Sequence, residues 1–406
     1  GVQGAVGGRL GRLLRGLLVP WRNGRYSSGQ ARSKLAGCPR FTWQNALTPS
    51  HLPSDGRDWR LCVAPMIDWT DRHCRYFHRL LAPRARLYTE MITTGALAYS
   101  DPERHLDFDA SEHPVALQLG GSELDALATS ARMGERWGYD EINLNCGCPS
   151  ERVLKGSFGA CLMADPMLVA DCYRAMRDAV DIPVTLKHRI GLDKNESYEF
   201  VRDFVGASYD AGCRVFIVHA RNAILKGLSP KENREIPPLR YDVARRLKRD
   251  FPDAVFVLNG GLRTADQIVE ELAPHDGVTL DGVMIGREAY QRPRSLSEMS
   301  ARLWPDVPLP SDEEVVDAMT AYTAERIAAG EPLRCVARHI LNLVNGQDGA
   351  RRWRQMLSDN RLLNGNDAQL IRQAYDTVVA AGRDRAAEKR EYLLGAAQPD
   401  AMSSGV

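Results

Sequence analysis

The segment Leu61–Asp68 reads LCVAPMID, a short apolar run that ends in a polar residue just before a longer segment with helical spacing. The same unit recurs along the chain. Eight runs of this kind are LCVAPMID at 61, ARLYTEMI at 85, PVALQLG at 114, YDEINLN at 139, PVTLKHR at 183, RVFIVHA at 214, AVFVLNG at 254 and DGVMIGR at 281. Most lack polar alternation, which is typical of parallel strands covered on both faces. Eight such units in about 230 residues predict an α/β fold, a closed (β/α)8 TIM barrel.

An open, doubly wound parallel sheet is the alternative that an alternation of strands and helices leaves. Such a sheet usually binds its dinucleotide through the motif G-x-G-x-x-G after the first strand. This motif is missing after Asp68. The closed barrel is therefore the predicted architecture.

The pattern changes after Pro293, where helical spacing continues without further strand-like runs. Four segments follow: DEEVVDAMTAYTAERIAAG from 312, LRCVARHILNLVNG from 333, GARRWRQMLSDN from 349 and DAQLIRQAYDTVVAAG from 367. They predict a separate C-terminal all-helical domain. We expect an extension at 1–57, the barrel at 58–305, the helical domain at 306–385 and a tail at 386–406.

Charge is distributed unevenly along the 406 residues, although the net charge is only +1. The first 54 residues hold eight of the 53 basic residues and no acidic residue, which leaves 45 basic against 52 acidic residues afterwards. The folded body is thus mildly acidic, and a nucleic-acid surface on it must be a local patch. No stretch approaches the roughly 20 apolar residues of a membrane-spanning helix, so we expect a soluble protein.

The Arg-rich, acid-free opening has the composition of an organellar transit peptide. The other interpretation is translated sequence upstream of the true start. The corresponding locations are the mitochondrion or plastid in the first case and the cytoplasm in the second. Nine scattered cysteines favour a reducing compartment with free thiols. The C-x-C pair Cys146 and Cys148 lacks a second ligand pair, so no metal site is expected.

Polar residues that end the strand-like runs are the first candidates for an active site, because a barrel places its site at the carboxyl ends of the strands. Asn259 and Gly260 end the seventh run and Gly261 follows it, and Gly286 and Arg287 end the eighth. Barrels commonly bind phosphate at this position through backbone N–H groups and a cation. A tight turn is the alternative for the glycines. The pairing of both motifs favours a phosphorylated cofactor or substrate.

Lys187, His219 and Cys148 lie near the ends of neighbouring runs. A lysine there suits a reduced flavin, which is negatively charged near its ring nitrogen 1, and His219 suits the flavin ring or its phosphate. His219 as a structural residue is the alternative. A loop thiol at a barrel mouth serves as a proton donor or as a small hydrophobe. We favour proton donation by Cys148.

Several runs together resemble one family. They are APMIDWTDRHCR, ALQLGG, INLNCGCPSERV with GSFGACLM, TLKHRIG, VHARNAILKGLSPKENREIPPL, LNGGL and MIGREAYQRP, which lie in order between about residues 60 and 360. This set is similar to the tRNA-dihydrouridine synthases, specifically the A subfamily. The departures are Cys146, where many members carry an apolar residue, and a longer loop PHDGVTLDG before the eighth run.

The resemblance implies FMN as cofactor, NADPH (or NADH) as reductant and tRNA as partner. It further implies that Cys148 donates a proton to carbon 5 of a D-loop uracil, at position 20 or 20a, while reduced FMN gives hydride to carbon 6. By position it assigns the flavin to Pro65, Met66, Ile67, Gln118, Lys187, His219, Asn259, Gly260, Gly261, Gly286 and Arg287. It assigns the tRNA to Asn145 and Arg234 and, less directly, to Lys231.

The target uracil must leave the folded tRNA to enter such a pocket, and Arg189 is a candidate for reading its polar edge. Arg351, Arg352 and Arg354 in the helical domain are candidates for phosphate contacts. A solvated helix face is the alternative for these three. We expect a monomer. Two rival functions stay open: an FMN barrel that reduces a free pyrimidine, and an RNA-binding protein that has lost catalysis.

Overall fold

The computed structural model describes residues 58–150, 156 and 158–396. The predicted extension at 1–57 and the last ten residues of the predicted tail therefore lie outside the described residues.

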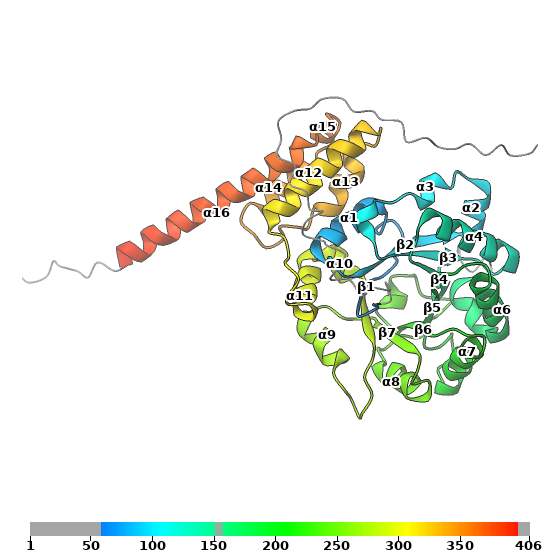
Figure 1. Ribbon diagram of the computed structural model, residues 1–406. Coiled ribbons are helices and arrows are strands. Elements are labelled where there is room, and N and C mark those ends of the chain that lie inside the picture. The colour runs from blue at the N-terminus through cyan, green and yellow to red at the C-terminus, as the bar shows by residue number, and fades with distance from the viewer. Residues whose placement is uncertain (1–57, 151–155, 157, 397–406) are drawn as a thin grey trace, which may run out of the picture. The chain divides into compact units, whose positions relative to one another are not determined.

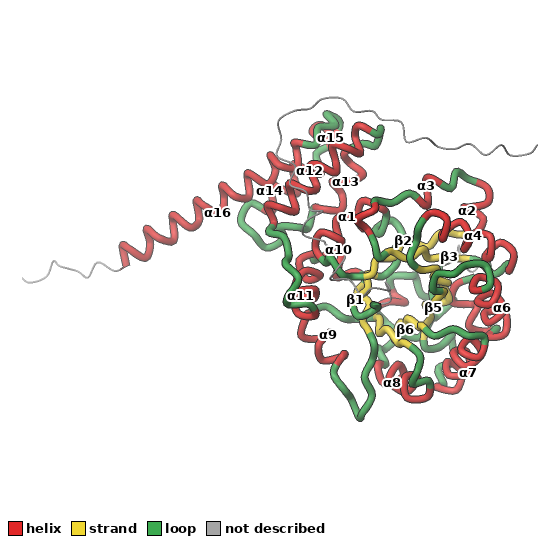
Figure 2. The backbone as a smooth tube through the Cα atoms, viewed as in Figure 1, coloured by secondary structure: helices red, strands yellow, loops and turns green. Residues whose placement is uncertain are grey.

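Eight parallel strands close into a barrel in which each strand pairs with its neighbours in sequence and β8 pairs with β1. Figure 1 shows the strands surrounded by helices, and Figure 2 shows them as a ring. The strands are β1 (Leu61–Val63), β2 (Arg86–Thr93), β3 (Val115–Gly120), β4 (Glu141–Cys146), β5 (Val184–Arg189), β6 (Val215–His219), β7 (Val255–Asn259) and β8 (Gly282–Ile285). Each of the eight predicted runs overlaps one strand, and the predicted (β/α)8 barrel is confirmed.

The segments between the strands and directly after β8 are mostly helical. They are α1 (Arg72–Leu81), α2 (Thr94–Tyr99), α3 (Glu103–Leu106), η3 (Ala110–Glu112), α4 (Leu124–Trp137), η4 (Gly159–Ala164), α6 (Pro166–Arg177), α7 (Tyr198–Asp210), η5 (Glu232–Arg234), α8 (Tyr241–Asp250), α9 (Ala265–Leu272), α10 (Arg287–Gln291) and α11 (Pro293–Leu303). Side-chain caps begin several of them. Asp71 accepts the backbone N–H groups of His73 and Cys74 at the start of α1, which satisfies donors that the helix itself leaves free.

The two faces of the strands differ in the groups that they bury. Outward-facing residues such as Leu117, Leu144 and Leu186 pack under the helices in the larger core. The inward-facing residues form a smaller apolar cluster, which includes Tyr88 and Ile217. Side chains alternate between the faces of a strand, so the polar residues at alternate positions of β4 and β5 also point into the barrel. The barrel interior is therefore apolar in part and polar along β4 and β5.

The C-terminal part is helical throughout, as the sequence predicts. Its helices are α12 (Asp312–Ala328), α13 (Leu333–Ile340), α14 (Ala350–Ser358), α15 (Asn360–Leu363) and α16 (Gln369–Ala396). The tail was predicted from 386, whereas α16 continues to Ala396. The segment AAEKREYL at 386–393 explains this, because nearly all of its residues favour helices. None of the described helices combines the length and the apolar character needed to cross a membrane.

Helix α1 connects the barrel to these C-terminal helices. Tyr76 stacks on Tyr322 of α12 with 4.0 Å between ring centroids, and His73 Nδ1 lies 2.8 Å from the Tyr322 hydroxyl. Asp71 Oδ2 accepts from His339 Nε2 of α13 at 2.9 Å. The barrel and the C-terminal helices thus share a packed interface within one compact unit.

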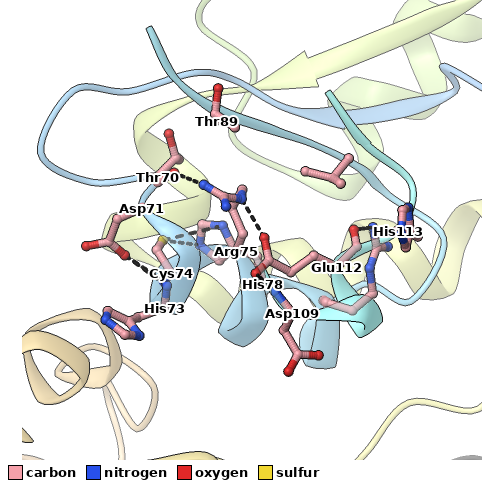
Figure 3. A network of polar contacts seen from close by, with 12 residues as sticks. Thr70, Asp71, His73, Cys74, Arg75, His78, Thr89, Asp109, Glu112 and His113 are labelled. Atoms are coloured by element: carbon pink, nitrogen blue, oxygen red, sulfur yellow. Dashed lines mark hydrogen bonds and ion pairs between the residues drawn. The ribbon is translucent and has the colours of Figure 1, made fainter. Parts of the chain in front are cut away.

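The inner side of α1 is held by a buried ion pair, shown in Figure 3. Arg75 Nε donates to Glu112 Oε2 at 2.6 Å, and Arg75 Nη1 donates to the Thr70 carbonyl at 2.9 Å. Glu112 also accepts the backbone N–H of Asp109 at 2.8 Å, which completes the capping box of η3. Arg75 therefore ties the loop after β1 to the segment that precedes β3.

Candidate active site

The strand-end residues predicted from the sequence meet at the carboxyl end of the barrel. The strand register places Asn145 beside Lys187 and Arg189 beside His219, and His219 in turn lies beside Asn259. The loop after β1 supplies Pro65, Met66 and Ile67, β3 supplies Gln118, and Gly286 and Arg287 follow β8. Neighbouring parallel strands thus bring together residues that are far apart in sequence.

Lys187 is a partly buried cation whose side chain contacts a neutral partner. Its Nζ donates to Asn259 Oδ1 at 3.1 Å, and among the described residues it forms no ion pair. Burial, followed by the charge of Arg189, lowers the pKa of Lys187 to about 7. Burial and the charges of Arg189 and Lys187 also lower the pKa of His219 well below its ordinary value. A ligand with negative charge would relieve this unfavourable electrostatics.

The loop after β7 adopts a backbone conformation that glycine takes more readily than any other residue, and we call it the glycine turn. Gly260 and Gly261 adopt φ angles of 119° and 74°, a region that residues with a side chain rarely adopt. A Cβ added to Gly261 would lie 2.4 Å from Leu239 Cδ1. Arg287 lies on the neighbouring segment after β8, where its Nη1 pairs with Glu235 Oε1 at 2.5 Å. Glycine N–H groups beside an arginine are a donor set that suits phosphate.

The residues at the mouth of the barrel suit a phosphorylated flavin. The lysine donates to a neutral amide and has no acidic partner among the described residues, and the glycine turn and Arg287 provide donors for a phosphate. A negatively charged ring and a phosphate are the two anionic parts of such a cofactor. The residues fit the group.

Cys148 lies on the loop after β4 and is partly exposed. The side chain of Asn145 shapes this loop, because Asn145 Oδ1 accepts the N–H groups of Gly147 at 3.0 Å and Cys148 at 2.9 Å. The thiol lies near Ser150 Oγ, at 3.4 Å. Asn145 lies beside Lys187 in the strand register, and Arg189 Nε donates to the Gly147 carbonyl of the same loop at 3.2 Å. The structure therefore brings Cys148, Lys187 and Arg189 into one mouth.

Arg189 binds three backbone carbonyls. Nε donates to Gly147 at 3.2 Å, and Nη1 donates to Asn222 at 3.1 Å and to Asn233 at 2.9 Å. These acceptors belong to the loop with Cys148, the segment after β6 and η5. Arg189 therefore holds three loops of the mouth together, a role that its strand-end position alone did not indicate.

The loop after β1 is held by hydrogen bonds from several sides. Thr70 Oγ1 accepts the Met66 N–H at 2.9 Å, and the Asp68 N–H donates to Glu90 on β2. Arg338 of α13 donates to the Asp68 carbonyl. Asp68 has a φ angle of 64°, so this turn requires such support. Arg338 and Asp68 are 270 residues apart in the sequence, so no local sequence pattern predicts their contact.

The candidate tRNA residues lie on two separate elements. Lys231 and Arg234 are exposed at η5. Arg351 and Arg352 are exposed on α14, and Arg354 is partly exposed with its Nη1 3.3 Å from Asn345 Oδ1. The opposite side of α14 is buried through Trp353, which is fully covered.

Two further buried polar residues, Glu141 and Thr185, were missed. Glu141 is fully buried and accepts hydrogen bonds from Tyr88, Trp59 and Thr185. The signal that could have found it is the polar residue at every second position of EINLN, at Glu141, Asn143 and Asn145. Side chains two residues apart in a strand point to the same face.

The mouth of this (β/α)8 barrel combines a lysine that forms no ion pair with any described residue, a turn of two positive-φ glycines beside an arginine, and a thiol. This set suits a flavin-dependent oxidoreductase. Comparison with known proteins is consistent with this class. The family model described as dihydrouridine synthase (Dus) matches residues 62–379. The chain belongs to the dihydrouridine synthase family.

Curated relatives match most of the chain. A tRNA-dihydrouridine(20/20a) synthase of Pseudomonas syringae pv. tomato is 55% identical over 325 residues, which cover 80% of this chain and 95% of that protein. The protein of the same name from Pseudomonas putida is 56% identical over 316 residues, with coverages of 78% and 92%. That of Synechocystis is 50% identical over 315 residues, with coverages of 77% and 93%. The family resemblance predicted from the motifs is confirmed.

Proposed function

We propose that this enzyme reduces a uridine in the D-loop of tRNA to 5,6-dihydrouridine, at position 20, 20a or both, with FMN as cofactor and NADPH as reductant. The relatives' names mention tRNA and both positions. The observation that carries the proposal is that Asn145, which lies beside Lys187 in the strand register, also accepts the backbone N–H of Cys148. We also propose that it acts as a cytoplasmic monomer.

The flavin, when bound, supplies the hydride that reaches carbon 6 of the uracil ring. Lys187 holds the negative charge of the reduced ring, and His219, Gly260, Gly261 and Arg287 hold the phosphate. Pro65, Met66, Ile67, Gln118, Asn259 and Gly286 contribute the remaining contacts. Cys148 donates its proton to carbon 5, and the product uracil ring is then saturated at both carbons.

The RNA side of the proposal uses residues at the mouth and on the C-terminal helices. The uracil leaves the stacked tRNA before it enters the pocket. Asn145 and Arg189 then face its polar edge, while Lys231 and Arg234 contact the neighbouring nucleotides. Arg351, Arg352 and Arg354 provide a local positive surface for phosphates, which a mildly acidic protein requires in order to bind RNA.

An anaerobic assay of the purified protein with NADPH and tRNA that lacks dihydrouridine tests the proposal. We expect flavin reduction by NADPH, flavin reoxidation by the tRNA, and dihydrouridine at position 20 or 20a by mass spectrometry. The same assay with free uracil should show no reoxidation. Reduction of free uracil without modification of the tRNA would instead assign the protein to the small-molecule barrel oxidoreductases.

The variant Cys148→Ala tests the proton donor. We expect it to retain flavin and tRNA binding but to form dihydrouridine at least 100-fold more slowly, because general acid catalysis contributes about 10²–10⁴ in rate. Cys161→Ala is the matched control, since Cys161 is also a partly exposed thiol near the barrel. Full activity of Cys148→Ala would exclude the thiol as proton donor.

A further inference from the structure

A continuous chain of side-chain hydrogen bonds crosses the polar interior of the barrel. We call it the Glu141 relay, and its members are Glu141, Thr185, Asn143, Gln118 and Asn145. Thr185 Oγ1 donates to Glu141 Oε1 at 2.5 Å, and Asn143 Nδ2 donates to Thr185 Oγ1 at 2.7 Å. Gln118 Nε2 donates to Asn143 Oδ1 at 2.7 Å, and Asn145 Nδ2 donates to Gln118 Oε1 at 2.8 Å. Every link has ordinary hydrogen-bond geometry, and the members are buried.

The first end of the relay is a carboxylate that can only accept. Besides Thr185, Glu141 accepts from Tyr88 Oη at 2.8 Å and from Trp59 Nε1 at 2.8 Å. Arg86 Nη1 lies 3.3 Å from Glu141 Oε2 and pairs with its charge, without the alignment of a hydrogen bond. Because donors surround both oxygens, the Thr185 hydroxyl must point its hydrogen toward Glu141. Its oxygen is then free to accept from Asn143.

The other end of the relay is a pair of groups that can only donate. The backbone N–H groups of Gly147 and Cys148 both point at Asn145 Oδ1, at 3.0 and 2.9 Å. The amide of Asn145 must therefore present its oxygen to the loop and its nitrogen to Gln118. The carboxylate at one end and the loop N–H groups at the other end therefore fix the same orientation for each amide between them, with its NH2 group pointing along the relay toward Glu141. Every donor in the relay faces an acceptor, and each amide has one orientation that allows this.

We infer that Glu141 and Thr185 are positioning residues for Cys148, although neither lies at the mouth. Glu141 fixes the direction of the relay, and Thr185 transmits it to Asn143. Asn145 is then held with its oxygen toward the loop, where it sets the turn that carries the thiol. The effect on catalysis depends on the proposed role of Cys148 as proton donor. The effect on the position of the Cys148 loop does not depend on that role.

The test compares Thr185→Val with Thr185→Ser in the flavin-loaded protein. Valine keeps the volume of threonine but removes the hydroxyl, so that Asn143 loses its acceptor and its amide can turn. Serine keeps the hydroxyl and therefore the relay. We measure the rate at which iodoacetamide alkylates Cys148 between pH 6 and 9, by mass spectrometry of its peptide. Cys335, which is partly exposed on α13, is the internal reference.

We expect alkylation of Cys148 to be at least threefold faster in Thr185→Val, because the loop loses its fixed turn, with Cys335 unchanged. Thr185→Ser should match the unmodified protein within twofold. With tRNA, kcat should fall about tenfold in Thr185→Val while the KM for tRNA stays within twofold, and serine should restore kcat. Thr323→Val, which removes a fully buried hydroxyl from α12, should change neither measurement.

Two results would overturn the inference: unchanged alkylation and turnover in Thr185→Val, or equal losses in Thr185→Val and Thr185→Ser. The second result would assign the effect to packing rather than to the hydroxyl. If Thr185→Val does not fold, Thr185→Cys carries the test, because its weak S–H donor should give intermediate values. Alkylation does not depend on turnover, so a failure of the proton-donor proposal remains distinguishable from a failure of the relay.

Discussion

Replacing Lys187 by methionine should stabilise the flavin-free protein and impair the flavin-loaded enzyme. The pKa of this lysine falls from 10.5 to about 7 because the side chain is buried near Arg189. Between these two values the unfolded chain binds more protons than the folded protein. The stability of the unmodified protein should therefore rise with pH from 7 to 10, and this rise should be missing from Lys187→Met.

The magnitude follows from the two pKa values. A difference of 10.5 − 7 corresponds to a cost of about 4 kcal/mol at pH 7, which declines to about 1 kcal/mol at pH 10. Part of the side chain is exposed, which lowers the cost, and methionine leaves Asn259 Oδ1 without the donor that now lies 3.1 Å away. A lost partner costs about 1 kcal/mol or more. We expect a net gain of roughly 2 kcal/mol in unfolding free energy at pH 7.

Urea unfolding of both flavin-free proteins at pH 7, 8.5 and 10 measures this difference. Lys194→Met is the control, because Lys194 is exposed and its replacement should give parallel pH profiles. With flavin bound, the gain at pH 7 should disappear, since the lysine then has an anionic partner. Parallel profiles for Lys187→Met and the unmodified protein would refute the idea that the mouth contains an uncompensated cation.

Three other changes test separate parts of the structure. Gly261→Ala should weaken flavin binding at least tenfold in a fluorescence titration, because a side chain at φ 74° is strained. Replacing Arg351, Arg352 and Arg354 by glutamine should weaken tRNA binding and reduce its salt dependence, with flavin retained. Trp353→Ala should lower the unfolding free energy by about 3–5 kcal/mol, because the fully buried indole leaves a large cavity.

For each of these three changes, one result would contradict the physical explanation of the expected effect. Gly330→Ala is the control for the glycine, since Gly330 also has a positive φ of 92° but a Cβ there meets nothing within 4 Å. If Gly261→Ala binds flavin as tightly as the unmodified protein does, the glycine turn does not belong to the cofactor site. Unaltered tRNA affinity in the triple arginine variant would place the RNA surface elsewhere. A small loss for Trp353→Ala would mean that the C-terminal helices unfold apart from the barrel.

The fold was predictable because its signal is local and repeated. Each strand is an apolar run of a few residues, and eight runs separated by helical segments leave few architectures. The strand-end rule then placed Lys187, His219 and Asn259 in one mouth without knowledge of any contact. Helix ends were harder to predict, since residues 386–396 continue α16 through helix-forming residues that resemble a charged tail.

The contacts that position the site were not predictable in the same way. Arg338 donates to the Asp68 carbonyl although the two residues are 270 positions apart in the sequence, and Arg189 donates three hydrogen bonds to three loops. Such pairings depend on the packing of α13 on α1 and on loop paths, which have no periodic signature. Glu141 lies between these cases, because the polar alternation in EINLN is visible in the sequence but its partners, Trp59 and Tyr88, are not.

The shared surface of α1 also affects the order of events during synthesis. Asp71 emerges from the ribosome early, whereas its partner His339 follows 268 residues later, a delay of roughly 13–54 s at about 5–20 residues per second. During that time the barrel can close, yet the ring of Tyr76 that later stacks on Tyr322 is still open to solvent. The nascent protein should therefore be most prone to aggregation, and most dependent on chaperones, after the last strand of the barrel has formed and before α12 and α13 arrive.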